Sequence, residues 1–107
     1  MKDTPLDQLT PVNFSRLLNL RFRVCLDAAN TLEAELIEVT PGHAMKDTPY
    51  ENFSLLFNGP RHPVLPQGIY GFEQDNLGRF ELFIVPVGQN QNGTQYQAVF
   101  NRLVKPG

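Results

Sequence analysis

The chain has 107 residues, of which 41% are hydrophobic and 19% charged, and its formal net charge at pH 7 is -2. A chain of this length can bury the core of one domain and leaves no room for a second. The charge balance argues against nucleic acid as a partner, because binding to phosphates depends on a strongly positive surface.

The N-terminal part of the chain predicts a lead-in followed by one short helix. Residues 1–9 are polar and interrupted by proline, which is typical of a loose segment. Thr10 followed by Pro11 has the form of a helix N-cap with proline at the first helical position, which predicts a helix over residues 11–18. Its core-facing side is defined by apolar residues at helical spacing, namely Phe14, Leu17 and Leu18.

From residue 21 onward apolar and polar residues alternate, which predicts strands. Residues 21–27 and 31–40 follow this pattern, and a short loop over residues 28–30, with Asn30 in the left-handed conformation, would join them as a hairpin. The cross-strand pairs that this loop predicts are Leu26 with Leu32, Val24 with Ala34, Phe22 with Leu36 and Arg23 with Glu35. The apolar parity changes afterwards, which predicts a bulge near residues 36 and 37.

The middle of the chain alternates loops with strands. Residues 41–52 contain prolines, a glycine and charges without periodicity, which predicts an exposed loop, and residues 53–57 form the next strand. Residues 58–67 carry a glycine and several prolines, so they exclude both a helix and a sheet ladder. We expect a rigid, extended connection there.

A second hairpin follows, with strands over residues 68–73 and 79–87. Its predicted cross-strand pairs are Glu73 with Arg79, Phe72 with Phe80 and Tyr70 with Leu82. Residues 82–87 are apolar on both parities, which predicts a strand enclosed on both faces. Residues 88–93 are predicted to form a polar loop, and residues 96–100 the last strand.

This succession predicts a mainly β fold of about six antiparallel strands with one short N-terminal helix, because the chain offers no helices that could cross between parallel strands. The sequence leaves open whether it is a small antiparallel barrel or a compact sandwich. We expect a single domain over residues 1–107, in which the barrel or sandwich spans 21–101. The pentapeptide Met-Lys-Asp-Thr-Pro, at 1–5 and again at 45–49, is too short to be a structural repeat.

The side chains that could bind a metal or take part in catalysis do not have the spacing of a known site. The candidate metal ligands Cys25, His43 and His62 lack the spacing of a zinc site, so we expect no metal. Neighbouring arginines could favour the thiolate of Cys25, but a cysteine is more often a small packing residue. Glu33 and Glu35 fit surface ion pairs better than an acid and base pair. We therefore expect no catalytic residue and no cofactor.

The proline-rich connection is the candidate binding site. Prolines reduce the entropy that a loop loses on ordering, so the connection could present Arg61, His62 and Val64 rigidly to a partner. The alternative is that these prolines only carry the chain around one end of the fold.

We expect a cytoplasmic protein. The first ten residues contain no apolar stretch, and the longest apolar run is too short for a span, so neither a signal peptide nor a membrane segment is predicted. The single Cys25 cannot form an internal disulfide, whereas small secreted domains commonly carry several.

Several strings in this sequence resemble those of a known family. They are Phe-Ser-Leu-Leu-Phe at 53–57, Val-Leu-Pro-Gln-Gly-Ile-Tyr at 64–70, Phe-Glu-Leu-Phe-Ile-Val-Pro-Val-Gly at 80–88 and Tyr-Gln-Ala-Val-Phe-Asn at 96–101. With them, the chain from about residue 9 to 101 resembles an uncharacterised family of small bacterial domains of unknown function. Its members are often encoded near phage-tail-collar-like proteins, which implies a role beside a tail-like assembly and supplies no catalytic residues.

Together these features predict a non-enzymatic interaction or assembly module that binds a protein through a strand edge or through residues 58–67. Exposed edges would also allow a homo-oligomer. The main alternative is a small-ligand-binding barrel, which would need an open apolar cavity with convergent polar groups. A hydrolase that uses His62 would need a carboxylate beside that histidine in an enclosed pocket.

Overall fold

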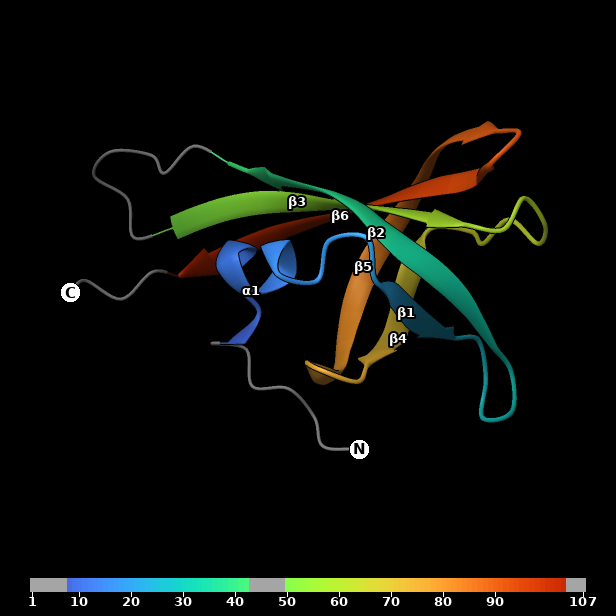
Figure 1. The fold of residues 1–107 in the computed structure, drawn as a ribbon, viewed down its shortest axis with the longest axis horizontal. Helices are drawn as coiled ribbons and strands as arrows, with labels where there is room; N and C mark the ends of the chain where they lie inside the picture. Colours follow the sequence, from blue (N-terminus) through green and yellow to red (C-terminus); the bar gives the residue numbers. More distant parts are fainter. Residues whose placement is uncertain (1–7, 43–49, 104–107) are drawn as a thin grey trace.

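Six strands close into a barrel in the computed structural model, which describes residues 8–42 and 50–103 (Figure 1). The elements are α1 (Pro11–Ser15), β1 (Arg21–Cys25), β2 (Thr31–Pro41), β3 (Tyr50–Gly59), β4 (Gly68–Gln74), β5 (Gly78–Asn90) and β6 (Gly93–Leu103). Around the barrel the strands follow the order β1-β2-β3-β6-β5-β4, and all neighbours are antiparallel. The predicted mainly β fold with one short helix is confirmed, and the architecture is a barrel.

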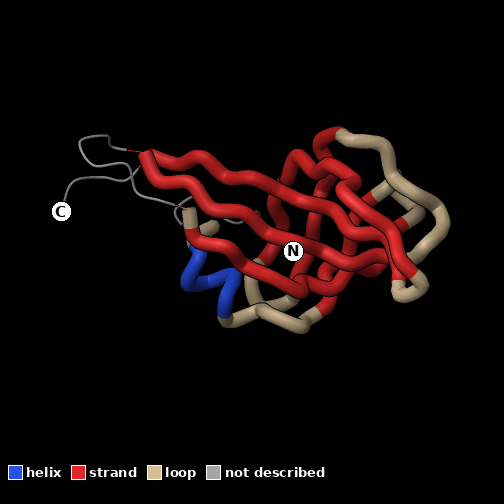
Figure 2. The backbone as a smooth tube through the Cα atoms, turned by 90° about the horizontal axis from the view of Figure 1, so that it is seen from above, coloured by secondary structure: helices blue, strands red, loops and turns tan. Residues whose placement is uncertain are grey.

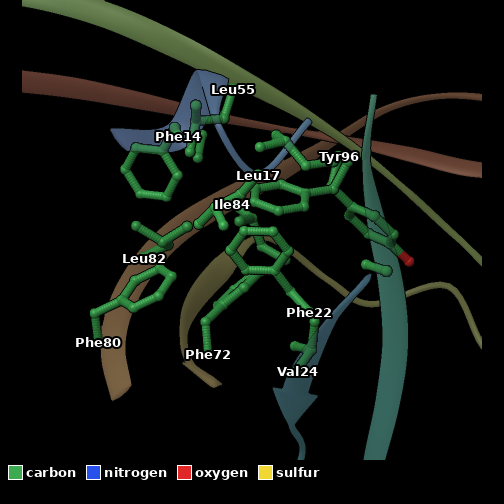
Figure 3. Close-up of a cluster of buried hydrophobic side chains, with 14 of the residues drawn as sticks. Phe14, Leu17, Phe22, Val24, Leu55, Phe72, Phe80, Leu82, Ile84 and Tyr96 are labelled. Atoms are coloured by element: carbon green, nitrogen blue, oxygen red, sulfur yellow. The ribbon is translucent and has the colours of Figure 1, made fainter. Parts of the chain in front are cut away.

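Alternation along the strands sends apolar side chains to the interior. Every strand contributes a side chain that is at most 2% exposed: Phe22 from β1, Leu36 from β2, Phe57 from β3, Phe72 from β4, Ile84 from β5 and Tyr96 from β6. Phe57 contacts both Phe22 and Phe72, with ring centroids 5.2 and 5.1 Å apart. Figure 3 shows the rings of Phe22, Phe72 and Phe80 gathered in the core, and the buried side chains of all six strands fill the interior.

Helix α1 closes the end of the barrel where β5 and β6 diverge. These two strands pair from Ile84 and Ala98 toward their hairpin, whereas the first part of β5 pairs only with β4. Figures 1 and 2 show α1 in the angle between the diverging parts of β5 and β6, beneath the long strands β3 and β6. Its Phe14 is fully buried, and the ring lies 5.8 Å from Phe80 and 5.6 Å from Phe100, centroid to centroid.

The helix begins as predicted but ends earlier. The hydroxyl of Thr10 accepts a hydrogen bond from the Asn13 backbone N–H at 3.1 Å, as an N-cap does. The helix ends at Ser15 because the chain must turn to pair with β2, and the Asn19 N–H donates to the Leu36 carbonyl at 2.7 Å. Leu18, which was predicted to face the core, is therefore 40% exposed.

The predicted register of the first hairpin is wrong by two residues. Val24 lies opposite Leu32 and Phe22 opposite Ala34, so each side chain keeps its face but has a different partner. The cause is Asp27, whose carboxylate accepts hydrogen bonds from the Ala29 and Asn30 backbone N–H groups at 2.8 and 2.9 Å. Strand β1 therefore ends at Cys25, and the loop is longer than predicted.

Two details of the predicted hairpin are corrected as a consequence. Asn30 is not left-handed, since Asn19, with a φ of 69°, is the one non-glycine residue of positive φ in the described ranges. Arg23 faces Glu33 instead of Glu35, and its guanidinium bonds to Asp75 at 2.9 Å and lies 3.5 Å from Glu73. These contacts lie across the short seam where β1 and β4 close the barrel.

The bulge and the second hairpin are confirmed. The register of β2 against β3 shifts between Leu36 and Glu38. The change in apolar parity along the sequence predicted a bulge at this position. In the second hairpin all three predicted pairs are observed, including Phe72 with Phe80. A second shift, between Pro86 and Gly88, agrees with the rule that proline in a sheet occurs at edges and bulges.

Several strands extend into segments predicted as loops. Pro41 belongs to β2, residues 50–52 to β3, and residues 58 and 59 also to β3, while residues 43–49 and both copies of the pentapeptide lie outside the described residues. The predicted polar loop over 88–93 is a hairpin that turns at residues 91 and 92, with Asn90 opposite Gly93.

Strand β5 is not enclosed on both faces. Leu82 and Ile84 are buried, but Phe83 and Val87 are 51% and 53% exposed. A barrel wall has one inner and one outer face, and no other described element covers the outer face of β5, so an apolar run does not imply burial on both sides.

Replacing Phe14 by alanine should lower the free energy of unfolding by about 3 to 5 kcal/mol, because it removes the ring that fills the open end of the barrel. Val12→Ala is the matched control on the same helix, since Val12 is 61% exposed; it should change stability by less than about 0.5 kcal/mol. Chemical denaturation measures both. A loss below about 1 kcal/mol for Phe14→Ala would contradict the packing described here.

Candidate functional site

The predicted binding residues lie on the loop of residues 60–67, which joins β3 to β4 at the end of the barrel opposite α1 (Figure 1). Arg61, His62 and Val64 are all exposed, and Val64 exposes 48% of its surface. The next residue, Leu65, is only 6% exposed and belongs to the hydrophobic core. The loop therefore presents one surface to solvent while a single side chain holds it to the interior.

A buried hydrogen bond fixes the loop to the barrel. The Leu65 backbone N–H donates to the hydroxyl of Tyr96 at 2.9 Å, and Tyr96 is 2% exposed. A buried N–H without a partner is costly, and a buried tyrosine hydroxyl also needs a partner, so each group satisfies the other. Figure 3 shows the Tyr96 oxygen at the margin of the core cluster, turned away from the packed rings.

Two further anchors hold the ends of the loop. The Arg61 carbonyl accepts hydrogen bonds from the Gln89 amide at 2.7 Å and from the Thr94 hydroxyl at 3.3 Å. At the other end, the hydroxyl of Tyr70 donates to the Pro66 carbonyl at 2.7 Å. With anchors at its start, middle and end, and with prolines that restrict φ, the loop has little conformational freedom.

The hairpin between β5 and β6 supplies the anchors at Gln89 and Thr94, and its geometry depends on a glycine. Gly93 has a φ of 148°, and a side chain there would collide with the Gly59 carbonyl oxygen. The Asn58 side chain accepts a hydrogen bond from the Gln95 amide at 2.6 Å and donates to the Asn92 carbonyl at 3.1 Å. These amides therefore link the tip of the hairpin to the end of β3.

Sequence reasoning found the exposed residues of the loop but missed the side chains that anchor it, namely Gln89, Thr94, Tyr96 and Tyr70. One available signal was the Asn-Gly dipeptide at residues 92 and 93, which commonly closes a tight hairpin. As the two central residues of a turn, this dipeptide would place Gln91 opposite Thr94, whereas the turn lies at residues 91 and 92 and pairs Gln89 with Thr94, so the signal locates the hairpin but not its register.

Cys25 lies on the outer wall beside a hollow of about 510 Å³ that Asp27, Arg79 and Glu81 also line. Its thiol is 3.6 Å from a carboxylate oxygen of Glu73. Desolvation, followed by the negative charge of Glu73, raises the pKa of the Cys25 thiol, and the nearby arginines only partly oppose this. The arrangement thus favours the protonated thiol, which is a poor nucleophile.

The other chemical candidates are placed as follows. His62 is exposed and has no carboxylate bonded to it among the residues described, while His43 lies outside them. Glu33 forms an ion pair with Arg21 at 3.0 Å, in agreement with a surface role. Within residues 8–42 and 50–103, no three side chains of the metal-binding types come together.

The described part of the chain contains no helix with the length and apolar character needed to cross a bilayer.

Replacing Tyr96 by phenylalanine should destabilise the fold by about 1 to 3 kcal/mol, because the Leu65 N–H stays buried without a partner. Tyr70→Phe is a matched control, because the hydroxyl of Tyr70 also bonds to the loop, at the Pro66 carbonyl. It should cost less than about 1 kcal/mol, because water can replace the hydroxyl at the exposed Pro66 carbonyl. Thermal and denaturant unfolding of both variants test this. Equal losses would show that the buried bond has no special role.

Cys25 should react with a disulfide reagent such as DTNB more slowly than a free cysteine at the same pH, since its pKa is raised and the thiolate is the reactive form. Glu73→Gln removes the negative charge and should shift the rate profile toward lower pH. Glu33→Gln is the control, because Glu33 bonds to Arg21 and not to the thiol. A Cys25 that reacts as fast as free cysteine would contradict the assignment.

Searches of curated proteins and of solved structures found no match. A family model does match, and it runs from Leu9, just before α1, to Phe100 in β6. The matched region includes the helix that closes the barrel, the anchored loop and almost all of the six strands. The chain therefore belongs to the family described as domain of unknown function DUF6916, which covers its residues 9–100.

Proposed function

We propose that this protein is a non-enzymatic interaction module that binds another protein through the loop of residues 60–67. The observation that carries the proposal is the anchoring of this loop: Leu65 and its N–H are held inside the barrel while Arg61, His62 and Val64 stay exposed. A loop that is already ordered loses little entropy on binding, so its contacts contribute more fully to affinity.

The filled interior supports an interaction module over the alternative, a small-ligand-binding barrel. A ligand-binding barrel needs a roomy interior, whereas here the inward side chains of all six strands and Phe14 occupy that space. A hollow of about 510 Å³ lies on the outer wall over β1, β4 and β5, and charged side chains make up much of its lining. The interior therefore favours a function that uses the outer surface.

The exposed side chains of the loop indicate the chemistry of the partner. Arg61 offers a planar cation that forms no ion pair with the described residues, and Val64 and the prolines offer a small apolar surface beside it. This combination suits a protein surface in which a carboxylate or a backbone carbonyl borders an apolar patch. The family resemblance implies a component of a phage-tail-like assembly as that partner, and we place the encounter in the bacterial cytoplasm.

Site-specific photo-crosslinking tests the proposal. A photoreactive residue at position 64 should capture the partner in the native cell, whereas the same residue at position 12, an exposed valine on α1 at the other end of the barrel, should not. Mass spectrometry identifies the captured protein. Equal capture from both positions would contradict the proposal that the partner binds through the loop.

Once the partner is identified, the double variant Arg61→Ala and His62→Ala should raise its dissociation constant at least about tenfold, which corresponds to about 1.4 kcal/mol. Both side chains are exposed, so the free energy of unfolding should stay nearly unchanged. Arg16→Ala, at the exposed end of α1, is the control and should bind as wild type. Titration calorimetry measures the three affinities. A double variant with wild-type affinity would refute the proposal.

A further inference from the structure

The dipeptide Asn-Gly occurs twice in the chain, at residues 58 and 59 and again at residues 92 and 93. Glycine has no side chain to shield its backbone nitrogen, so this nitrogen can approach the amide carbon of the preceding asparagine. Attack within one chain is favoured, because the two groups are already held close together. Both dipeptides therefore have the composition of a site where asparagine deamidates spontaneously, and the surrounding structure decides which of them reacts.

The structure holds Asn58 at both ends of its side chain. The Asn58 oxygen accepts a hydrogen bond from the Gln95 amide at 2.6 Å, and the Asn58 nitrogen donates to the Asn92 carbonyl at 3.1 Å. Its backbone lies in the ladder between β3 and β6, where Asn58 is opposite Gln95 and Gly59 is opposite Thr94. The Gly59 nitrogen can reach the Asn58 side chain only if these strands separate.

The side chain of Asn92 is not held in this way. Asn92 is a turn residue of the hairpin between β5 and β6, where its side chain is exposed and forms no hydrogen bond to any described residue. Two exposed hydrogen bonds hold its backbone. The Asn92 N–H donates to the Asn90 side chain at 2.8 Å, and the Asn92 carbonyl accepts from Asn58. Figure 1 shows this hairpin projecting from the barrel near the loop that joins β3 to β4.

The two sites differ in how much of the structure must open before they react. Gly93 is buried against the Gly59 carbonyl, so its nitrogen becomes available when the hairpin tip opens. That opening breaks the exposed bond between Asn92 and Asn58 and the last backbone pair of the hairpin. Opening at Gly59 must also release Thr94, which is 2% exposed. Small openings at a loop tip cost less free energy than openings that reach the core.

We propose that Asn92 is a site of spontaneous deamidation in the folded protein, whereas the fold protects Asn58 from the same reaction. The Gly93 nitrogen attacks Cγ of Asn92, and a bond forms between these two atoms. The bond from Cγ to the side-chain nitrogen breaks, and that nitrogen leaves as ammonia with the proton of the Gly93 N–H. Water then opens the cyclic imide at either carbonyl and leaves aspartate or isoaspartate. Water is the co-reactant, and nothing is oxidised or reduced.

Isoaspartate at position 92 loosens the loop of residues 60–67. The main chain of isoaspartate passes through its side-chain carbons, so the hairpin tip becomes longer and its carbonyl no longer meets Asn58. The same hairpin holds the Arg61 carbonyl through Gln89 and Thr94. A longer tip displaces these anchors, so the start of the loop gains freedom. The modification site is independent of the proposed function, and only the effect on partner binding rests on that function.

Peptide mapping by mass spectrometry tests the site, with one sample incubated folded at neutral pH and a second unfolded in urea. In the folded protein Asn92 should be modified at least about tenfold faster than Asn58, which corresponds to about 1.4 kcal/mol in the barrier. In urea the two rates should become similar, because both asparagines precede glycine and no structure protects either.

Three results would overturn the proposal. The first is a folded protein in which both asparagines react at similar rates. The second is a folded protein in which Asn92 stays intact while the unfolded chain reacts. The third is a rate difference that persists in urea, which would assign it to the local sequence instead of the fold.

Backbone ¹⁵N relaxation tests the effect on the loop. As Asn92 is converted, the order parameter of Arg61 should fall from about 0.85 toward about 0.6. Asn92→Gln cyclises poorly and should keep its value on incubation. Asn92→Asp adds the charge without lengthening the main chain and should also keep it. An unchanged order parameter after conversion would contradict the effect on the loop. A low value before incubation would contradict the rigid loop of the proposed function, which the mass-spectrometric test does not require.

Discussion

The packing of the Phe14 ring closes one end of the barrel. Strands β5 and β6 diverge beyond Ile84 and Ala98, and the ring of Phe14 enters the space between them and meets Phe80 and Phe100. Dense packing tolerates few voids, so the interior behaves as one solid unit that holds the six strands in position. Because that interior is occupied, we place the proposed interaction on the outer surface.

The same interior controls the loop at the opposite end. Tyr96 packs its ring in the core and bonds through its hydroxyl to the Leu65 N–H at 2.9 Å, so the position of the loop is set by the barrel. Gln89 and Thr94 add bonds from the neighbouring hairpin. Hydrogen bonds to the rigid strands therefore hold the loop that carries the exposed Arg61, His62 and Val64. A preorganised binding surface needs this rigidity.

The sequence pattern predicted those parts of the fold that depend on contacts between residues close together in the chain. The register of the second hairpin followed from Phe72 with Phe80 and Glu73 with Arg79, where burial and charge agree, and both pairs are observed. The predicted register of the first hairpin was wrong because the Asp27 carboxylate closes a longer loop. The alternation of apolar and polar residues does not reveal that contact. The anchor of the candidate site joins Leu65 to Tyr96, 31 residues apart, and the outward side of Phe83 depends on barrel closure. Neither can be derived from the neighbours of these residues in sequence.

Backbone ¹⁵N relaxation of Arg61, His62 and Val64 tests the central claim, that a packed barrel holds this loop rigid for binding. We expect order parameters of about 0.85 at these three residues, as for residues in the strands, with a value at Val64 no lower than at its buried neighbour Leu65. Values below about 0.6 at Arg61, His62 and Val64 would show a flexible loop and contradict this claim.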